Sequence, residues 1–562
     1  MKELRQLGRD ARRRLARSPA GAVWRRVRGR HRLLPGNRSR SATLPGASPS
    51  TRPFPVPATE LDRSRYDIPD DAVAAVLDGA FGHGYLLSST GSPQLPGFLD
   101  QWACLRVGPL WLRTAPRTVV TVSRDDSDAS ATHIVILLGH PVDVDLHTTR
   151  AAAIADRLRD LLGLENGHDL AVRSAAYLAG RWTAVLVSGG RCTVLTDAMG
   201  SQPVFYTHDT DGVTFASSDV LVALAHDLPV EPRLASLEQE IRELHPRGVV
   251  YLPGKVTCFE GVAQVVPNCL LTFELTQEPT VTHRRYWPFE PRVEQGDLEA
   301  VHAEFADRMR RQLALFAELG PLAWSLTGGL DCRVALAHLD LATAEQSCAF
   351  TYLNPRDVER DPTGGAIRDV FVANLLAHRT GLRHRVLRWR QAKKGTTFRR
   401  IHDATHPVRP LSHGAAHAMW ADLPHDIFEV QGNGGEIGTV FRRDRSTDPL
   451  TPAKAAGIWL GSVFASTPRY VDLLADYLEH AHLDDARLLG YSHYDVLYWE
   501  LRMGRWGWTK FLDGDLSHRI LPPFNDRRLL EVMLSLPEEQ RVGKALYARV
   551  LRDAPLLQVD DD

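Results

Sequence analysis

The chain has 562 residues, a formal net charge of −1 and 44% hydrophobic residues. This length exceeds what one hydrophobic core usually supports, so two or three domains are expected. The balanced charge and ample hydrophobic content exclude a wholly disordered chain and give no general indication of nucleic-acid binding.

Cysteine spacing and hydropathy argue against a membrane-spanning, secreted, disulfide-bonded or zinc-binding protein. No apolar run approaches the roughly 18 residues of a membrane span, and no apolar segment follows the N-terminal charges as in a secretion signal. The cysteines show no CxxC spacing, which predicts reduced thiols of a cytoplasmic protein and neither disulfides nor a zinc site. They are Cys104, Cys192, Cys258, Cys269, Cys332 and Cys348.

Residues 1–57 are predicted to form a disordered basic tail and linker. Residues 1–40 carry many arginines against only Glu3 and Asp10, and residues 34–57 are rich in Pro, Ser and Gly. Such a tail can bind nucleic acid, anionic lipid or an acidic partner. It can equally be merely solvated, or belong to a wrongly assigned start of the chain.

Residues 58–290 are predicted to form a sheet-rich domain with layered helices. Gly189-Gly190 and Asp211-Gly212 separate apolar runs, as hairpin turns do. One amphipathic helix is expected at residues 148–163, because its apolar residues recur at three- and four-residue spacing. The expected strands lie in residues 118–123, 133–139, 182–197, 204–218 and 264–275.

Residues 291–562 change to long amphipathic helices with few strands. A helix at 298–319 leads into an apolar run at 321–324 and a glycine loop, and strands are expected at 347–352 and 384–389 around a helix at 370–382. The alternation of strand and helix predicts a parallel nucleotide-binding sheet with its ligand at the carboxyl ends of the strands.

The glycine loop is SLTGGLDCR, residues 325–333. Between a strand and a helix, Gly328 and Gly329 allow the backbone N–H groups to approach a phosphate closely. A carboxylate beside a polyphosphate is repelled unless Mg²⁺ bridges the two, which accounts for Asp331. The alternative is an ordinary strand-to-helix turn.

The chain has no GxxxxGK[ST] motif, and the glycines of residues 431–438 do not fit GxGxxG.

Several motifs resemble one family. TGGLDC (residues 327–332) resembles the SGGLDS pyrophosphate loop of the asparagine synthetase family, which includes β-lactam synthetases and lasso-peptide macrolactam cyclases. GNGGEIG (residues 432–438) is similar to that family's GEGADEL loop, and residues 521–539 are similar to its PFLDRRLVEFALSLP segment. Residues 178–206 are similar to the end of its glutaminase-type domain. The resemblance covers about residues 130–550.

The resemblance implies a fold of two parts. Residues 58–290 would be a degenerate class II glutamine amidotransferase-like domain with an Ntn-hydrolase-like sandwich of sheets and helices. Residues 291–562 would be an ATP-pyrophosphatase domain of the adenine-nucleotide α-hydrolase type, a PP-loop parallel sheet with many helices. The overall class is therefore mixed, α/β and α+β.

The resemblance also implies an ATP-dependent ligase that adenylates a carboxylate and transfers it to an amine or ammonia, with ATP and Mg²⁺ as cofactors. Asp331 and Glu436 would bind the metal ion, and backbone atoms of residues 347–352 would contact adenine. The nucleotide would lie against Ser325, Thr327, Gly328, Gly329, Leu330, Asp331, Cys332, Gly432 and Gly434.

Three departures from the family pattern bear on activity. The first cysteine is Cys104, whereas the family's glutaminase uses an N-terminal cysteine, so glutamine hydrolysis is not expected and the first domain would be a scaffold. Cys332 replaces a serine. The family's C-terminal catalytic lysine has no counterpart, so its charge would come from Lys544, Arg333 or Arg549; the alternatives are a surface lysine and a solvent-facing Arg333.

Weaker patterns leave further alternatives open. His413 and His417 lie one helical turn apart, but no third ligand accompanies them, so zinc is not predicted there. Glu500, Arg502 and Arg505 would either line an acceptor pocket or belong to the core. The function expected is amide ligation in specialised biosynthesis. The alternative is a non-catalytic descendant that binds a nucleotide or partner protein.

Overall fold

The computed structural model describes residues 79–125, 132–245, 250–276, 278–361, 364–406, 408, 412–440 and 449–559. The tail and linker predicted for residues 1–57 lie outside these residues. All described residues belong to one compact unit. Among them, no helix has the length and apolar character needed to cross a membrane.

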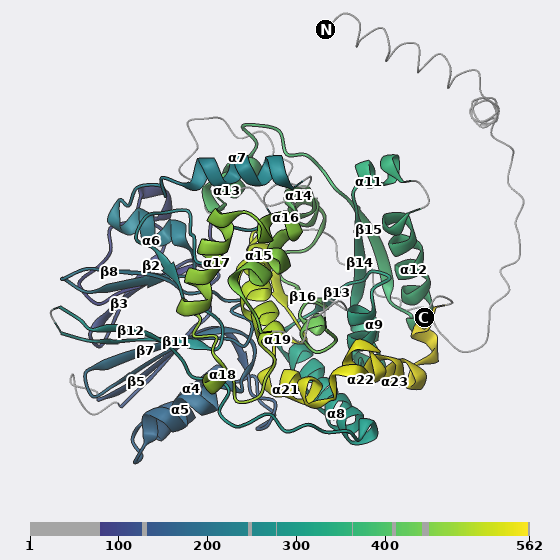
Figure 1. The fold of residues 1–562 in the computed structure, drawn as a ribbon, viewed down its shortest axis with the longest axis horizontal. Coiled ribbons are helices and arrows are strands. Elements are labelled where there is room, and N and C mark those ends of the chain that lie inside the picture. Colours follow the sequence, from purple (N-terminus) through teal and green to yellow (C-terminus); the bar gives the residue numbers. More distant parts are fainter. Residues whose placement is uncertain are drawn as a thin grey trace, which may run out of the picture. The chain divides into compact units, whose positions relative to one another are not determined.

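Two antiparallel sheets of six strands each stack face to face in the first half of the described chain (Figure 1). One sheet has the order β10-β8-β9-β1-β3-β2, with strands Ala263–Gln264, Phe205–His208, Val213–Ala216, Tyr85–Ser88, Leu110–Thr114 and Ala103–Val107. The other has the order β12-β11-β7-β6-β5-β4, with strands Val281–Arg285, Cys269–Glu274, Arg191–Thr196, Ala179–Ser188, His133–Val142 and Val120–Arg124.

The alternation of side chains along β5 explains this layering. Ile134 and Ile136 belong to the core between the two sheets, whereas Val135 and Leu137 pack under helices on the outer face. Successive residues of a strand point to opposite faces, so an all-apolar strand is buried on both sides. The helices of this half are α4 (Ala151–Leu162), α5 (Gly167–Ala176), α6 (Asp219–His226) and α7 (Leu234–Leu244).

The second half contains the predicted parallel sheet. Its order is β15-β14-β13-β16-β17, and every pair is parallel, with strands Arg383–Arg388, Cys348–Leu353, Leu322–Ser325, Phe428–Gln431 and Arg519–Leu521. Around it lie α8 (Leu298–Leu319), α9 (Leu330–Leu336), α10 (Leu341–Gln346), α11 (Pro355–Arg360), α12 (Gly365–Thr380), α13 (Thr397–Thr405) and α14 (His413–Asp422). The fold class expected from the sequence, mixed antiparallel and parallel sheets with many helices, is confirmed.

The remaining helices follow β16 along the chain. They are α15 (Pro452–Leu460), α16 (Ser462–Ala465), α17 (Pro468–His480), α18 (Asp485–Leu488), α19 (His493–Leu497), the π-helix η7 (Tyr498–Gly507), α20 (Trp508–Asp515), α21 (Arg527–Ser535), α22 (Glu538–Val542) and α23 (Ala545–Asp553). Within the described part of the chain, the short 3₁₀ turns are η5 (Gly97–Leu99), η6 (Gly435–Ile437) and η8 (Pro555–Leu557).

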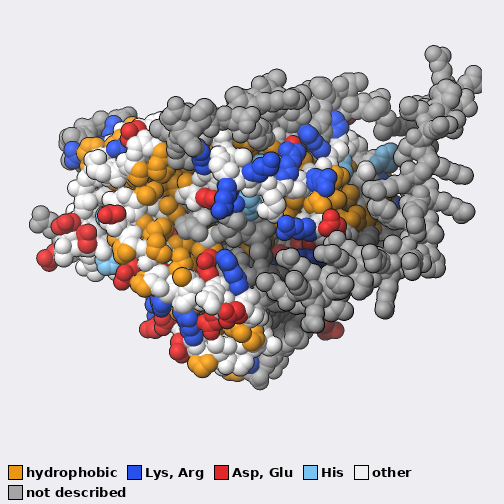
Figure 2. Space-filling model, turned by 90° about the horizontal axis from the view of Figure 1, so that it is seen from above, with side chains coloured by type: hydrophobic (Ala, Val, Ile, Leu, Met, Phe, Trp, Pro, Cys, Tyr) orange, Lys and Arg blue, Asp and Glu red, His pale blue; other side chains and the backbone are white. Residues whose placement is uncertain are grey.

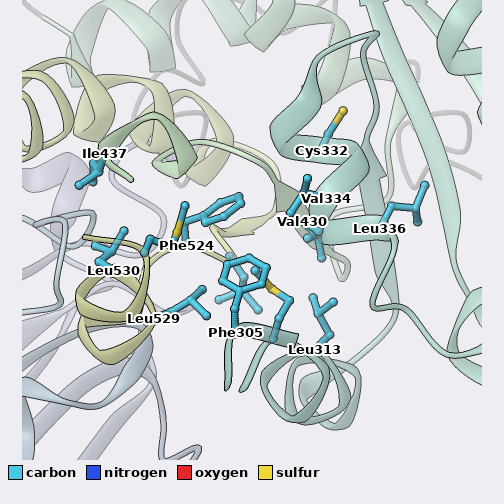
Figure 3. Packing of buried hydrophobic residues seen from close by; sticks show 14 of the residues in the cluster. Phe305, Leu313, Cys332, Val334, Leu336, Val430, Ile437, Phe524, Leu529 and Leu530 are labelled. Carbon is cyan, nitrogen blue, oxygen red and sulfur yellow. The ribbon is translucent and has the colours of Figure 1, made fainter. Parts of the chain in front are cut away.

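A hydrophobic core lies beneath the glycine loops. Figure 3 shows Phe305 and Leu313 of α8 facing Val334 of α9, Val430 of β16 and Phe524. Because these apolar residues come from separate segments, the core holds α9 and the end of β16 in fixed positions, and with them the loops that follow β13 and β16.

Buried ion pairs join the two halves. Arg181 of β6 donates to both carboxylate oxygens of Asp515 on α20, at 2.7 and 2.8 Å, and Arg519 of β17 donates to the same carboxylate. A bidentate pair of this kind restricts geometry as well as adding energy. The boundary predicted at residue 290 lies in the connection between β12 and α8, and it stays a prediction.

Charge is unevenly spread over the described surface. On the face seen in Figure 2, Lys and Arg side chains gather near the middle, and acidic side chains gather toward the left and lower edges. The net charge of −1 therefore conceals local regions of both signs.

Candidate active site

The carboxyl ends of β13 and β16 lie side by side. Ser325 pairs with Gln431 in the parallel register, so the two glycine loops leave the sheet at the same edge. At Gly432, a Cβ atom would lie 2.8 Å from the backbone nitrogen of Cys332, closer than real Cβ contacts allow. A glycine is therefore required at this position, because the second loop packs directly on the first.

Asp331 and Glu436 form a pair of carboxylates at this edge. Asp331 is in the first turn of α9, and Glu436 is in η6. Burial, followed by the negative charge of Glu436, raises the pKa of Asp331 to about 7, although the Tyr547 hydroxyl and the charge of Lys544 act in the opposite direction. Ionising Asp331 is therefore unfavourable in this buried site beside Glu436, and a divalent cation between the carboxylates would offset that cost.

We expect the affinity for Mg²⁺ to fall with decreasing pH. The folded-state pKa of Asp331 lies above its usual 3.8, so between these values the folded protein holds a proton that Mg²⁺ must displace. Affinity should weaken about tenfold per pH unit below about 7 and level off above it. Calorimetric titration with Mg²⁺ at several pH values measures this, and an affinity independent of pH would contradict it.

Other polar side chains surround the carboxylate pair. The Tyr547 hydroxyl donates to Asp331 Oδ1 at 2.6 Å, and Lys544 precedes the same helix, α23, with a left-handed φ of 54°. Burial and the charge of Glu436 raise the pKa of Tyr498, which also interacts with Arg502. Sequence reasoning missed Tyr547 and Tyr498. Tyr547 lies in the segment singled out for Lys544, one helical turn further on, and that spacing could have indicated it.

The glycine loop makes hydrogen bonds of its own. Thr327 Oγ1 accepts from the Gly329 N–H at 3.0 Å. Cys332 Sγ donates toward the carbonyl oxygens of Thr327 and Gly329, both at 3.2 Å, and burial raises the pKa of this thiol. The thiol is thus a buried donor inside the loop. Ser325 is also buried, at the end of β13, whereas Leu330 is partly exposed at the start of α9.

A carboxylate contacts the loop from α12. The Gly328 N–H donates to Asp369 Oδ1 at 2.9 Å, so an acidic side chain of the protein already binds one of the amides expected to receive phosphate. Sequence reasoning missed this residue, because nothing in the spacing of α12 relates Asp369 to Gly328.

We expect Asp369→Asn to tighten ATP binding about fivefold, because a hydrogen bond to a charged acceptor is roughly 1 kcal/mol stronger than one to a neutral acceptor. The amide oxygen of asparagine can still accept from Gly328, but the charge that repels phosphate is gone. Equilibrium binding of ATP to both proteins is the measurement, with the exposed Glu359→Gln of α11 as the control. Weaker binding by Asp369→Asn would mean that Asp369 organises the loop for the nucleotide.

The three basic side chains proposed from the sequence lie in different environments. Arg333 is buried and donates to the carbonyl oxygens of Gly329 and Leu557, both at 3.3 Å, so it neither points to solvent nor lies open to a phosphate. Arg549 pairs with Glu299 of α8 and with Asp553. Of the three cations proposed from the sequence, Lys544 is the one whose charge acts on Asp331.

The antiparallel half supports the second glycine loop. Gly434 has a φ of 99°, and a Cβ atom there would overlap the sulfur of Met199. The backbone of Met199 is itself held by Asn525 Oδ1 at 2.8 Å. The first half therefore packs directly against the second glycine loop through Met199, which follows β7 within the segment 178–206.

The three charged residues of η7 divide between core and pocket. Glu500 is fully buried and accepts two hydrogen bonds from Arg285, both at 2.7 Å, and Arg505 is buried against Gln264. Arg502 instead lines a pocket together with Tyr498. Arg502 interacts with Tyr498, on which the charges of Glu436 and Asp331 also act, and π-helical turns are frequent at functional sites.

His413 and His417 both lie buried on α14. The ring of His417 stacks on Phe398 at a centroid distance of 4.6 Å, and that of His413 lies edge-on to His402. The group of three side chains placed to hold a metal ion among the described residues is a different one, formed by His402, His406 and Asp513.

No protein-family model and no curated protein matches the chain. Solved structures that align with it do so at low similarity, as two of them show. The first is a glutamine phosphoribosylpyrophosphate amidotransferase from B. subtilis complexed with ADP and GMP, with 10% identity over 73% of this chain and 76% of that one, and a TM-score of 0.21. The second is described as the allosteric regulatory enzyme of purine biosynthesis, with 9% identity over 64% and 70%, and a TM-score of 0.24.

These comparisons do not show that the chain belongs to the asparagine synthetase family. TM-scores of 0.21 and 0.24 are too low to carry an argument about fold or activity. The likeness to the asparagine synthetase family therefore depends on the motifs quoted above, and function has to be argued from the site itself.

Proposed function

We propose that this protein is an ATP-dependent, AMP-forming amide ligase. The observation that carries the proposal is the pair of carboxylates, Asp331 and Glu436, on two glycine loops that leave adjacent parallel strands at one edge of the sheet. A carboxyl whose pKa is raised to about 7 by burial and a like charge costs stability when ionised, and a binding function would account for keeping it.

The proposed reaction has two steps. An oxygen of a substrate carboxylate attacks the α-phosphorus of ATP, and the bond to pyrophosphate breaks. An amine, or ammonia, then attacks the acyl carbon; the carbon–nitrogen bond forms, AMP leaves with the bonding electrons, and the nitrogen loses a proton. Backbone amides of the loop would bind the pyrophosphate, for which those of Gly328 and Gly329 would exchange their present acceptors, Asp369 and Thr327.

The carboxylates fit Mg²⁺, which prefers oxygen ligands, and when bound it would neutralise charge on the phosphates. Lys544, whose charge acts on Asp331, would lie near the leaving group and stabilise its developing charge. The pocket lined by Arg502 and Tyr498 would receive the amine substrate.

A non-catalytic descendant that binds a nucleotide or a partner protein is the second candidate. The contact between Asp369 and the Gly328 amide favours it, because that carboxylate binds where a phosphate would bind in an active loop. If this candidate binds a nucleotide, it differs from the ligase only in turnover; if it binds a partner protein, no nucleotide is expected at this edge of the sheet.

Exchange of labelled pyrophosphate into ATP tests the proposal. The assay is run with Mg²⁺ across a panel of carboxylates, with single amines added to each, beside equilibrium binding of ATP. Carboxylate-dependent exchange supports adenylation and identifies the acid. Binding of ATP without exchange in any combination supports a non-catalytic nucleotide-binding protein. Absence of ATP binding contradicts the ligase and favours a non-catalytic protein that binds a partner.

A further inference from the structure

His402, His406 and Asp513 form a second cluster of titratable groups. His402 lies in α13, His406 follows the end of that helix, and Asp513 belongs to α20. All three are buried, and one ligand atom from each lies within 4.8 Å of the others. The ligase proposed above has no use for this cluster.

The facing atoms of the cluster have no hydrogen-bond partner among the described residues. His402 Nε2 and His406 Nε2 lie 3.5 and 3.4 Å from Asp513 Oδ1, and none of these atoms makes a hydrogen bond of acceptable geometry. Burying polar atoms without hydrogen-bond partners is unfavourable, because they lose their hydrogen bonds to water and gain none in the protein. Such a cost indicates that something absent from the chain itself satisfies them.

The neighbouring contacts orient the atoms as ligands. His406 Nδ1 lies 3.3 Å from the carbonyl oxygen of His402, which can only accept, so Nδ1 carries the proton and Nε2 presents a lone pair. The hydroxyl of Ser412 donates to Asp513 Oδ2, which leaves Oδ1 facing the imidazoles. A hydrogen bond from the second ring nitrogen of a histidine to a backbone carbonyl, and one received by the second oxygen of a carboxylate, typically orient the ligands of a protein-bound metal ion.

The spacing agrees with a shared cation. Two ligands that each lie about 2.0–2.1 Å from a tetrahedral ion are roughly 3.3 Å apart. The observed distances of 3.4 and 3.5 Å from Asp513 Oδ1 are close to this value and longer than a good hydrogen bond.

We propose that His402, His406 and Asp513 bind one divalent transition-metal ion, with zinc as the preferred ion. Two imidazoles and one carboxylate suit zinc better than Mg²⁺, which prefers oxygen ligands. His413, whose ring lies edge-on to His402 at 4.5 Å and whose Nε2 is also unpartnered among the described residues, is placed to approach as a fourth ligand. His406 also lines a pocket, so one member of the cluster borders a cavity.

The role of the ion is structural. It links the end of α13 to α20, and α20 also carries Lys510, whose ammonium lies 4.8 Å from the centre of the Tyr352 ring at the end of β14. Loss of the ion should therefore loosen α20 against the edge of the parallel sheet where the nucleotide is proposed to bind.

The test uses the full-length chain carrying Asp331→Asn, so that the carboxylate pair of the candidate active site does not contribute a strong metal site. Zinc content is measured after purification, after removal by a chelator and after reloading. We expect one zinc per chain and a higher melting temperature with zinc than without it. His406→Gln and Asp513→Asn should each weaken zinc binding by more than about 100-fold, beyond the 10–100-fold typical of changes outside the ligand set.

Matched variants separate ligation from general disturbance. His417→Gln removes another buried imidazole of the same region and should keep the zinc, whereas Ser412→Ala should weaken binding about tenfold. Zinc content is also measured on the chain that carries Asp331→Asn alone, and this result does not depend on whether the other variants fold. If that protein binds no zinc after reloading, or if His406→Gln and Asp513→Asn bind zinc as tightly as His417→Gln, the proposal is overturned.

Discussion

Asp331→Asn is expected to lower Mg²⁺-dependent ATP–pyrophosphate exchange by at least about 100-fold, the loss typical of removing a group that stabilises transition-state charge. The substitution keeps the shape of the side chain and an oxygen that can accept from Tyr547, so the loop packing should survive. It removes the charge that, together with Glu436, would hold the cation.

The control for this experiment is Asp307→Asn, which changes an exposed carboxylate of α8 and should leave the exchange rate unchanged. Melting temperatures of both variants show whether the fold is retained. If the Asp331→Asn protein is folded and exchanges pyrophosphate at the normal rate, Asp331 does not bind the metal ion. The proposed reaction would then lose its main support.

Glu500→Leu is expected to destabilise the protein by about 3–5 kcal/mol, because it leaves the charge of Arg285 buried without its partner. Both side chains are almost fully buried, and they join β12 of the antiparallel half to η7. Asn268 also loses an acceptor, since its amide donates to Glu500 Oε1 at 3.0 Å. Urea unfolding measures the difference.

A second substitution distinguishes a core ion pair from an acceptor pocket. Adding Arg285→Met to Glu500→Leu should recover part of the lost stability, because the unpaired charge is then removed as well. The carbonyl oxygens of Trp287 and Ala481, which accept from Arg285, limit this recovery. A Glu500→Leu protein of unchanged stability that selects a different amine would place Glu500 in the acceptor pocket.

Local patterns in the sequence predict much of the second half. The helix expected at residues 298–319 is α8, and it begins directly after Asp297, whose side chain accepts hydrogen bonds from two backbone N–H groups of its first turn. The helix expected at 370–382 is α12, which starts earlier, at Gly365, and ends before Gly381 with its φ of 73°. Capping residues and apolar periodicity are local properties, so a sequence reports them well.

The same patterns miss elements whose stability comes from distant partners. Strands β1, β2 and β3 were not among those expected. β1 has only four residues, and it pairs with β9, more than a hundred residues away in the chain. A strand this short is stabilised by its neighbours in the sheet more than by its own composition, so propensity alone does not identify it.

By itself, the sequence determined the strand, glycine loop and helix at residues 322–336, the second glycine loop and the acidic residue on each, because turn chemistry and apolar periodicity act over a few residues. Only the tertiary structure decided that Asp331 lies against Glu436 and Tyr547, that Arg333 turns to Leu557, and that Asp369 reaches Gly328. The physical reason is that burial and charge at each of these atoms are set by segments far apart in the chain. The packing of the whole core brings those segments together, and no short stretch of sequence encodes their distances.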